Sequence, residues 1–185
     1  MRLFIAIDLP AEVHLELEAL QRDLKPVTDS ARWVAPASIH LTLKFLGETA
    51  EPKLPEIDDA LVGLSWKPFP VTVRGIGFFP GNRSPRVFWA GLEASTMEGL
   101  AQQIDIRMER LGFEKEKRAF RPHLTLARAR ESRIEGSLVA AAEKYEQHEF
   151  GSFMVDRFHL VQSTLMPTGA VYARLREYLL ESPRR

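Results

Sequence analysis

The chain has 185 residues, of which 45% are apolar and 27% are charged, values that are ordinary for a globular protein. Lysine plus arginine and aspartate plus glutamate each number 25, so the formal net charge is zero. This balance argues against a protein that coats nucleic acid by bulk charge, although a local basic cleft can still bind one RNA end. The sequence contains no cysteine, which excludes disulfides, thiolate nucleophiles and cysteine-ligated zinc sites.

The length fits one ordinary domain or two small lobes that share a core, so we expect a single two-lobed domain over residues 1–185. No apolar run approaches the length that spans a membrane. The apolar run at residues 1–10 is too short for a signal peptide and is expected to form the first strand. These features are compatible with a monomeric protein of the reducing cytoplasm.

The spacing of apolar residues predicts alternating strands and helices. Helices are expected over residues 10–24, 52–64, 95–111 and 134–145. Strands are expected over residues 2–9, 38–45, 69–79, 86–92, 120–129, 150–163 and 171–180, with turns at 80–85 and 167–169. This order predicts an α+β fold in two similar lobes.

The tetrapeptide His-Leu-Thr-Leu occurs twice, at residues 40–43 and, 83 positions later, at residues 123–126. Side chains alternate between the faces of a strand, so each histidine shares a face with its threonine while the leucines form an apolar back. One such strand is usually structural. Two identical copies, one in each half of the chain, indicate a duplicated unit whose halves face each other across a pseudo-twofold axis.

If the two strands meet at one cleft, His40 and His123 face the same space, with Thr42 and Thr125 beside them. This arrangement suits in-line displacement at phosphorus, in which one histidine accepts a proton from water and the other donates one to the leaving oxygen. An ordinary pKa of about 6.5 makes both protonation states of histidine available. The threonine hydroxyls can hydrogen-bond the phosphoryl oxygens. The two motifs are identical, so the sequence leaves open which histidine is the acid.

Four further residues near the motifs are candidates for substrate binding. Lys44 alternates onto the face of His40, where it contacts phosphate or ends the strand in solvent. Trp33, in a loop expected over residues 26–37, either anchors that loop on the core or stacks on a base. Arg121 and Arg128 can make bidentate contacts to phosphate. Arg121 alternates onto the histidine face, whereas Arg128 needs a twist or bulge to reach it.

The remaining histidines have structural interpretations. His14 is expected to be a solvated residue on the first helix, because carboxylates surround it in the sequence. His159 is expected to be a hydrogen-bonded histidine inside a strand, since no threonine partner or repeat accompanies it.

Four segments together resemble a known family: MRLFIAID at residues 1–8, Trp33-Val34, HLTLKFLG at residues 40–47 and RPHLTLAR at residues 121–128. They are similar to the RNA 2',3'-cyclic phosphodiesterase branch of the two-histidine phosphoesterase superfamily, first named the 2'-5' RNA ligase family. The likeness runs over nearly the whole chain, and both motifs are intact. The resemblance implies two antiparallel-rich sheets, with helices on the outside, around a V-shaped cleft with the histidines at its floor.

The resemblance also implies a function: metal-independent opening of a terminal RNA 2',3'-cyclic phosphate to a 2'-phosphomonoester, without a cofactor. It implies that His40 is the proton donor and His123 the proton acceptor, that Arg128 is the usual companion of the second motif, and that reversal gives weak 2'-5' RNA joining. The alternatives are a non-catalytic RNA-end or nucleotide-binding module and a cyclic phosphodiesterase for small nucleotides. A metal-dependent phosphohydrolase is disfavoured, because the sequence shows no His-x-x-x-His and no Asp-rich cluster beside the histidines.

Overall fold

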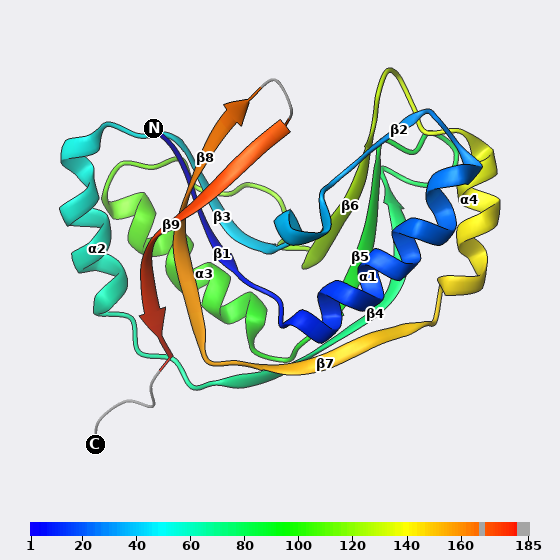
Figure 1. Cartoon of the computed structure of the whole chain (residues 1–185). Helices are drawn as coiled ribbons and strands as arrows, with labels where there is room; N and C mark the ends of the chain where they lie inside the picture. The colour runs from blue at the N-terminus through cyan, green and yellow to red at the C-terminus, as the bar shows by residue number, and fades with distance from the viewer. Residues whose placement is uncertain (167–168, 181–185) are drawn as a thin grey trace.

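The computed structural model describes residues 1–166 and 169–180 (Figure 1). Residues 167 and 168 of the predicted turn therefore lie outside the described residues. Over those that are described, nine strands form one curled sheet of antiparallel neighbours, ordered β7-β4-β5-β6-β3-β1-β8-β9, with β2 paired to β6. The strands are β1 (Arg2–Ile7), β2 (Ala31–Trp33), β3 (Leu41–Glu48), β4 (Phe69–Phe79), β5 (Val87–Glu93), β6 (His123–Ala129), β7 (Glu149–Val155), β8 (Arg157–Met166) and β9 (Gly169–Leu179).

All the predicted helices are present, and they lie outside the sheet, as the predicted α+β fold requires. They are α1 (Ala11–Leu24), α2 (Leu54–Val62), α3 (Met97–Arg110) and α4 (Gly136–Ala142), with short 3-10 turns at Lys25–Val27, Pro36–Ser38, Glu51–Lys53 and Glu143–Tyr145. Helices α2 and α3 flank the lobe built on β1, β3, β8 and β9, and α1 and α4 flank the other (Figure 1). Over the described residues, no helix is long and apolar enough to cross a membrane.

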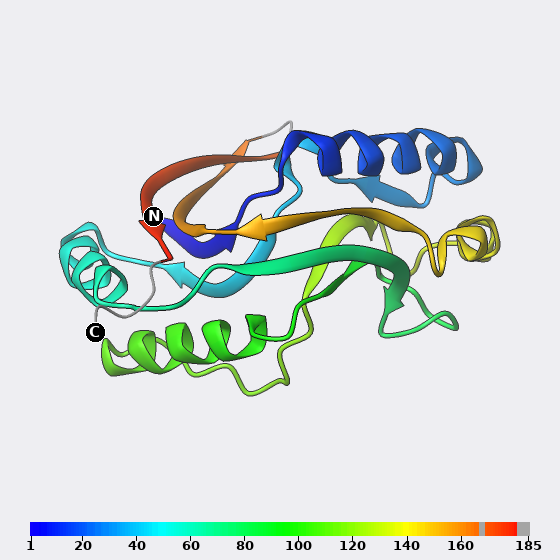
Figure 2. The same ribbon diagram turned by 90° about the horizontal axis from the view of Figure 1, so that it is seen from below.

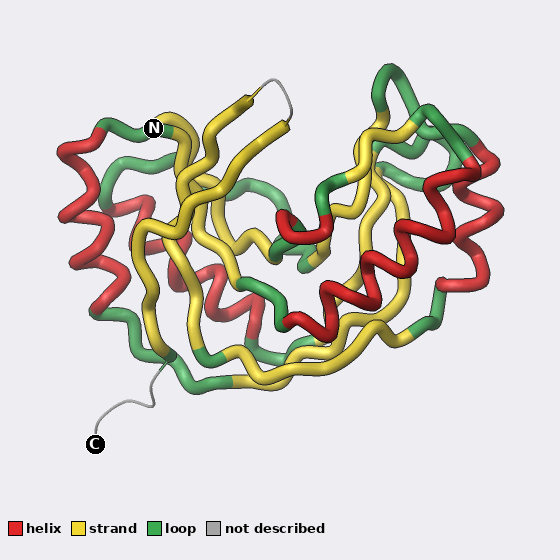
Figure 3. The backbone as a smooth tube through the Cα atoms, viewed as in Figure 1, coloured by secondary structure: helices red, strands yellow, loops and turns green. Residues whose placement is uncertain are grey.

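The two lobes are joined through the sheet itself. Strands β3 and β6, which carry the two motifs, pair antiparallel at Leu41 and Leu124. Figure 3 shows the strands rising as two arms on either side of this junction. The expectation of two separate sheets is thus corrected, because the arms belong to one continuous sheet that bends where the motif strands meet.

The lobes also exchange segments, which the sequence order does not reveal. Helix α1 follows a strand of the first lobe but packs on β7 of the second, and α3 follows a strand of the second lobe but packs on β3 of the first (Figure 2). The long strand predicted over residues 150–163 is in fact two strands, separated at Asp156. The first half, β7, pairs with β4, and the second half, β8, pairs with β1.

Strand β1 has apolar side chains on both faces because both faces are covered. Leu3 and Ile5 are fully buried in the main core with the helices. Phe4 and Ala6 alternate to the other face, where they form a small separate cluster with Val161 of β8. This second cluster lies beside His40, since Phe4 stacks on its imidazole ring. The first motif therefore packs, through His40, against an apolar cluster of the first lobe.

Candidate active site

Both motif histidines are anchored in the same way. His40 stands immediately before β3, and its Nδ1 lies 2.8 Å from the carbonyl oxygen of Ser38. His123 is the first residue of β6, and its Nδ1 lies 2.7 Å from the carbonyl oxygen of Arg121. A carbonyl oxygen can only accept, so Nδ1 donates in both rings. In the neutral ring the proton is therefore on Nδ1, and the opposite nitrogen, Nε2, carries the lone pair.

The junction of the lobes brings the two motifs side by side. Leu41 and Leu124 are direct partners, and each is followed in its own strand by the motif threonine and preceded by the motif histidine. Both leucines are buried, while Thr42 and Thr125 are half-buried on the opposite face. Since β3 and β6 run antiparallel, the histidine of each motif lies toward the threonine of the other. The predicted meeting of the two strands is confirmed.

Aromatic rings hold both imidazoles in place. His40 stacks on Phe4, with ring centroids 4.7 Å apart and planes inclined by 26°, and meets the edge of Tyr172 at 5.0 Å. His123 meets the ring of Phe79 edge-on, with centroids 5.0 Å apart. Rings in such contact, together with the carbonyl hydrogen bonds, restrict each imidazole to one orientation.

The electrostatic settings of the two histidines differ. Burial lowers the pKa of both below the ordinary value, because a desolvated imidazole favours its neutral form, and in each case the carbonyl hydrogen bond partly opposes this effect. The charge of Asp8 additionally raises the pKa of His40. The charge of Arg128 instead lowers the pKa of His123 further. The two motifs, although identical in sequence, thus have neighbours of opposite charge: Asp8 near His40 and Arg128 near His123.

Lys44 does not lie on the histidine face. Its side chain is 5% exposed and points into the first lobe, where its ammonium pairs with Asp105 of α3 and donates to the carbonyl oxygen of Glu114 at 2.9 Å. A bulge causes this placement, since Leu43 and Lys44 are both buried and the register with β1 shifts at this point. The prediction that Lys44 shares the face of His40 is wrong, and we do not assign it a contact to substrate.

The same irregularity in the second motif strand has the opposite consequence for Arg128. Leu126 and Ala127 are both buried, and the register with β5 shifts between Phe88 and Trp89. The shift returns the exposed Arg128 to the face of Thr125, which a regular strand would not do. The charge of Arg128 reaches His123, as its effect on that pKa shows.

A further arginine was missed by the sequence analysis. Arg32 of β2 is the direct partner of Arg128 in β6, and side chains opposite each other in antiparallel strands lie on one face. Among the described residues, neither guanidinium forms an ion pair with a carboxylate. Two positive charges without a carboxylate partner thus lie side by side on one face of the sheet. The signal available in the sequence was only that Arg32 precedes Trp33.

The other two candidates lie near the second motif. Trp33 lies in strand β2, not in a loop, and its ring packs edge-on against Phe88 of the core, with centroids 5.9 Å apart. This contact fits the interpretation of Trp33 as an anchor. Arg121 precedes β6 with an exposed side chain, and its carbonyl oxygen orients His123. A contact between the Arg121 side chain and phosphate stays a prediction.

A cavity of about 410 Å³ opens beside the first motif. Its polar lining comes from Asp8, His14, Ser38, His40, Tyr172 and Arg174. The prediction that His14 is fully solvated is corrected, since its Nδ1 is buried and has no hydrogen-bond partner among the described residues. The cavity therefore extends the site from His40 toward the start of α1.

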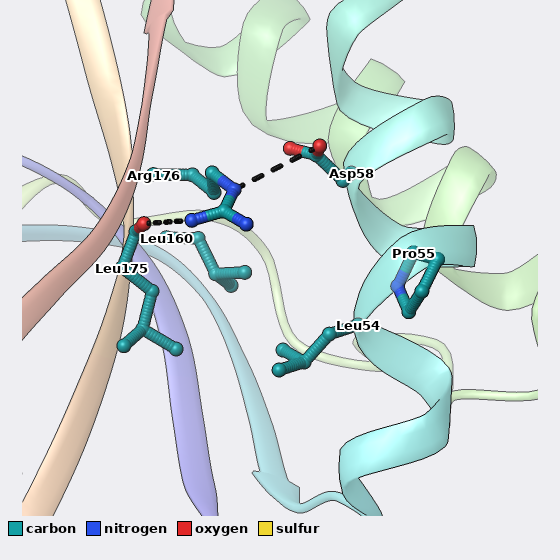
Figure 4. A pocket seen from close by; sticks show the side chains of 6 residues that line it. All are labelled: Leu54, Pro55, Asp58, Leu160, Leu175 and Arg176. Carbon is teal, nitrogen blue, oxygen red and sulfur yellow. Dashed lines mark hydrogen bonds and ion pairs between the residues drawn. The ribbon is translucent and has the colours of Figure 1, made fainter.

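A second pocket, of about 240 Å³, lies between α2 and strands β8 and β9, and contains no motif residue (Figure 4). Its lining is mainly apolar, with one ion pair, 3.8 Å long, between Arg176 and Asp58. No group of three or more His, Asp or Glu side chains in the described part of the chain is placed to hold a metal ion.

Comparison with known proteins places this geometry in a family. The family described as LigT like phosphoesterase matches residues 7–89 and 92–172. A curated protein of Archaeoglobus fulgidus named RNA 2',3'-cyclic phosphodiesterase is 35% identical over 96% of this chain and 99% of its own. One of the same name from Thermotoga maritima is 35% identical over 98% of this chain and 96% of its own.

Solved structures agree with these relatives. A crystal structure of a Thermus thermophilus protein covers 100% of both chains, with a TM-score of 0.85 and 33% identity. E. coli LigT complexed with 3'-AMP covers 97% of both chains, with a TM-score of 0.78 and 28% identity. The fold, the paired motifs and these similarities together show that the chain belongs to the LigT-like phosphoesterase family.

Proposed function

We propose that this protein hydrolyses a terminal RNA 2',3'-cyclic phosphate to a 2'-phosphomonoester, using its two histidines as general acid and base and requiring no metal. The observation that carries the proposal is the mirrored pair of imidazoles, each fixed through Nδ1 by a carbonyl oxygen two residues earlier and each beside the junction of β3 and β6. Relatives named RNA 2',3'-cyclic phosphodiesterase support the substrate, and the 3'-AMP complex of E. coli LigT supports a nucleotide ligand.

In this mechanism, His123 Nε2 takes a proton from water while the water oxygen bonds to phosphorus. The bond from phosphorus to the 3' oxygen breaks, and His40 Nε2 gives that oxygen its proton. Thr42 and Thr125 donate hydrogen bonds to the non-bridging oxygens, and Arg128 offsets their charge. The assignment of acid and base is favoured by the neighbours of the histidines, since an anion near His40 stabilises its proton and a cation near His123 does not.

The direct test mixes the protein with a short RNA that ends in a 2',3'-cyclic phosphate, with a chelator present, and follows phosphorus by NMR. Formation of a 2'-phosphomonoester supports reaction, regiochemistry and metal independence together. His40→Ala and His123→Ala should each lower kcat by about 10²-fold or more. A flat pH–rate profile, or a small loss from either substitution, would contradict the mechanism.

Two other functions would give different results in the same assay. A non-catalytic RNA-end or nucleotide-binding module would bind the RNA and leave the cyclic phosphate intact. A cyclic phosphodiesterase for small nucleotides would turn over a mononucleoside 2',3'-cyclic phosphate at least as well as the oligonucleotide. Weak 2'-5' joining, as the reverse reaction, is part of the proposal, as are a monomeric state and a cytoplasmic location.

A further inference from the structure

Asp8 is a charged neighbour of the first motif that has no equivalent in the second. It directly follows β1, whose last partners in the sheet are Ile7 and Leu41. The next residues on the two antiparallel chains are Asp8 and His40, so the backbone brings them to the same end of the sheet. By alternation Asp8 lies on the face of Ala6, and both residues line the cavity that contains His40.

Two side chains contact the Asp8 carboxylate. Its Oδ2 lies 2.7 Å from Nε of Arg174, in an ion pair, and 3.2 Å from Nδ1 of His159, and neither contact has the alignment of a hydrogen bond. The other nitrogen of His159 lies 3.1 Å from Oε2 of Glu177. The prediction that His159 is a hydrogen-bonded histidine inside a strand is confirmed by this contact with Glu177. The His159 side chain is buried, with 3% of the residue exposed, and packs directly against the Asp8 carboxylate.

The other groups that face His40 in this cavity are few. They are His14 from α1, and Tyr172 and Arg174 from β9. Of the described residues that line the cavity, Asp8 alone carries a carboxylate. The side chain of Arg174 is 67% exposed and that of Asp8 is 29% exposed, so solvent screens the positive charge more strongly than the negative one. We therefore expect the net influence of the pair on His40 to be that of an anion, which opposes the lowering of the His40 pKa by burial.

We propose that Asp8, fixed by Arg174 and His159, is a positioning residue whose charge favours the proton-donating form of His40 and so determines which of the two identical motifs acts as the acid. The inference rests on the proposed function. It explains how two motifs with the same histidine and threonine can differ in which histidine donates the proton and which accepts it. In the second half the charged neighbour is Arg128, which favours a neutral, proton-accepting His123.

The test compares the wild-type protein with Asp8→Asn, which removes the charge, and Asp8→Glu, which retains it. Asp58→Asn is the matched control: Asp58 is a carboxylate of the same lobe that accepts a hydrogen bond from Tyr178 at 2.9 Å and does not line the cavity of His40. Two quantities are measured for each variant. NMR follows the titration of the His40 imidazole without substrate, assigned with His40→Ala, and kcat/KM for an RNA 2',3'-cyclic phosphate is measured against pH.

In Asp8→Asn, the midpoint of the His40 titration should fall by about one pH unit, the lower end of the shift that a neighbouring opposite charge produces. The alkaline limb of the pH–rate profile should move down with it, so that activity above that limb is about tenfold lower while the acid limb is unchanged. Asp8→Glu and Asp58→Asn should both resemble the wild type. Thermal unfolding of each variant shows that the proteins compared are folded.

Three results would overturn the proposal: an unchanged His40 midpoint in Asp8→Asn, a shifted midpoint with an unmoved alkaline limb, or a loss in Asp8→Glu equal to that in Asp8→Asn. The last would assign the effect to packing instead of charge. If the wild-type protein does not open the cyclic phosphate at all, the proposed function fails and the assignment of an acid fails with it. The NMR titration then still shows separately whether the charge of Asp8 acts on His40.

Discussion

Replacing Lys44 with methionine tests whether Lys44 stabilises the fold or binds substrate. The Lys44 side chain is 5% exposed and that of its partner Asp105 is 15% exposed. Methionine keeps the length and apolar stem of lysine but leaves the Asp105 carboxylate without its counter-ion. Asp105 retains one hydrogen bond, from the backbone N–H of Glu116 at 3.2 Å.

Breaking a buried ion pair on one side typically costs about 3–5 kcal/mol. Because Asp105 keeps a hydrogen bond and some contact with water, we expect Lys44→Met to lie at the low end, near 3 kcal/mol. For a chain of this size, such a loss lowers Tm by about 6–12 °C. The double variant Lys44→Met/Asp105→Leu removes the stranded charge and should recover most of the lost stability, since an apolar pair of similar volume is often neutral.

Urea unfolding gives the free energy, and kcat/KM is measured at 25 °C, where the variant stays folded. We expect kcat/KM of Lys44→Met to equal that of the wild type. The reciprocal control is Arg128→Met, because Arg128 is exposed and on the other face: its stability should be unchanged while kcat/KM falls. A Lys44→Met protein with wild-type stability and a large loss of kcat/KM would refute the placement of Lys44 in the fold and restore it as a phosphate contact.

Burial lowers the pKa of both His40 and His123, so the kcat/KM profile, which reports the free enzyme, should have its midpoints displaced below the ordinary histidine value of about 6.5; an optimum above pH 8 would contradict this. Between the lowered pKa values and about 6.5, the unfolded chain binds more protons than the folded chain. The free energy of unfolding should therefore rise with pH over that interval, and this rise should be smaller in His40→Ala. Thr42→Val and Thr125→Val should each reduce kcat by about 10²-fold with little change in Tm, and an effect on KM alone would assign them to ground-state binding. Arg128→Lys should not restore the activity that Arg128→Met loses, because an ammonium cannot make the bidentate contact; equal rates in Arg128→Lys and wild type would reject that contact.

Strand alternation predicted the motif faces correctly but failed just beyond the threonine of each motif. His40 and Thr42 share a face with one another as expected, because the backbone is regular between them. Bulges then shift the register, which buries Lys44 and returns Arg128 to the site. The position of a bulge cannot be read from the alternation of apolar and polar residues in the sequence. The sequence analysis could therefore only name Arg128 as a residue that such an irregularity could re-aim.

The apolar pattern predicted every α-helix but not the lobe that each helix packs against. A stripe of leucines shows that a helix buries one face, and it contains no information on which of two similar lobes supplies the partner. For this reason the crossing of α1 and α3 between lobes was not predicted. Asp8 was missed for a related reason: its neighbours Arg174 and His159 are more than 150 positions away in the sequence.

The order of strands in the sheet has a consequence for synthesis on the ribosome. The lobe that carries the first motif contains β1 and β3 from the beginning of the chain, but β1 gains its second neighbour only when β8 has been made. Until then the apolar strand β1 has an unpaired edge. The nascent chain therefore carries an unpaired apolar strand over most of its elongation, a feature that makes incomplete chains prone to aggregate.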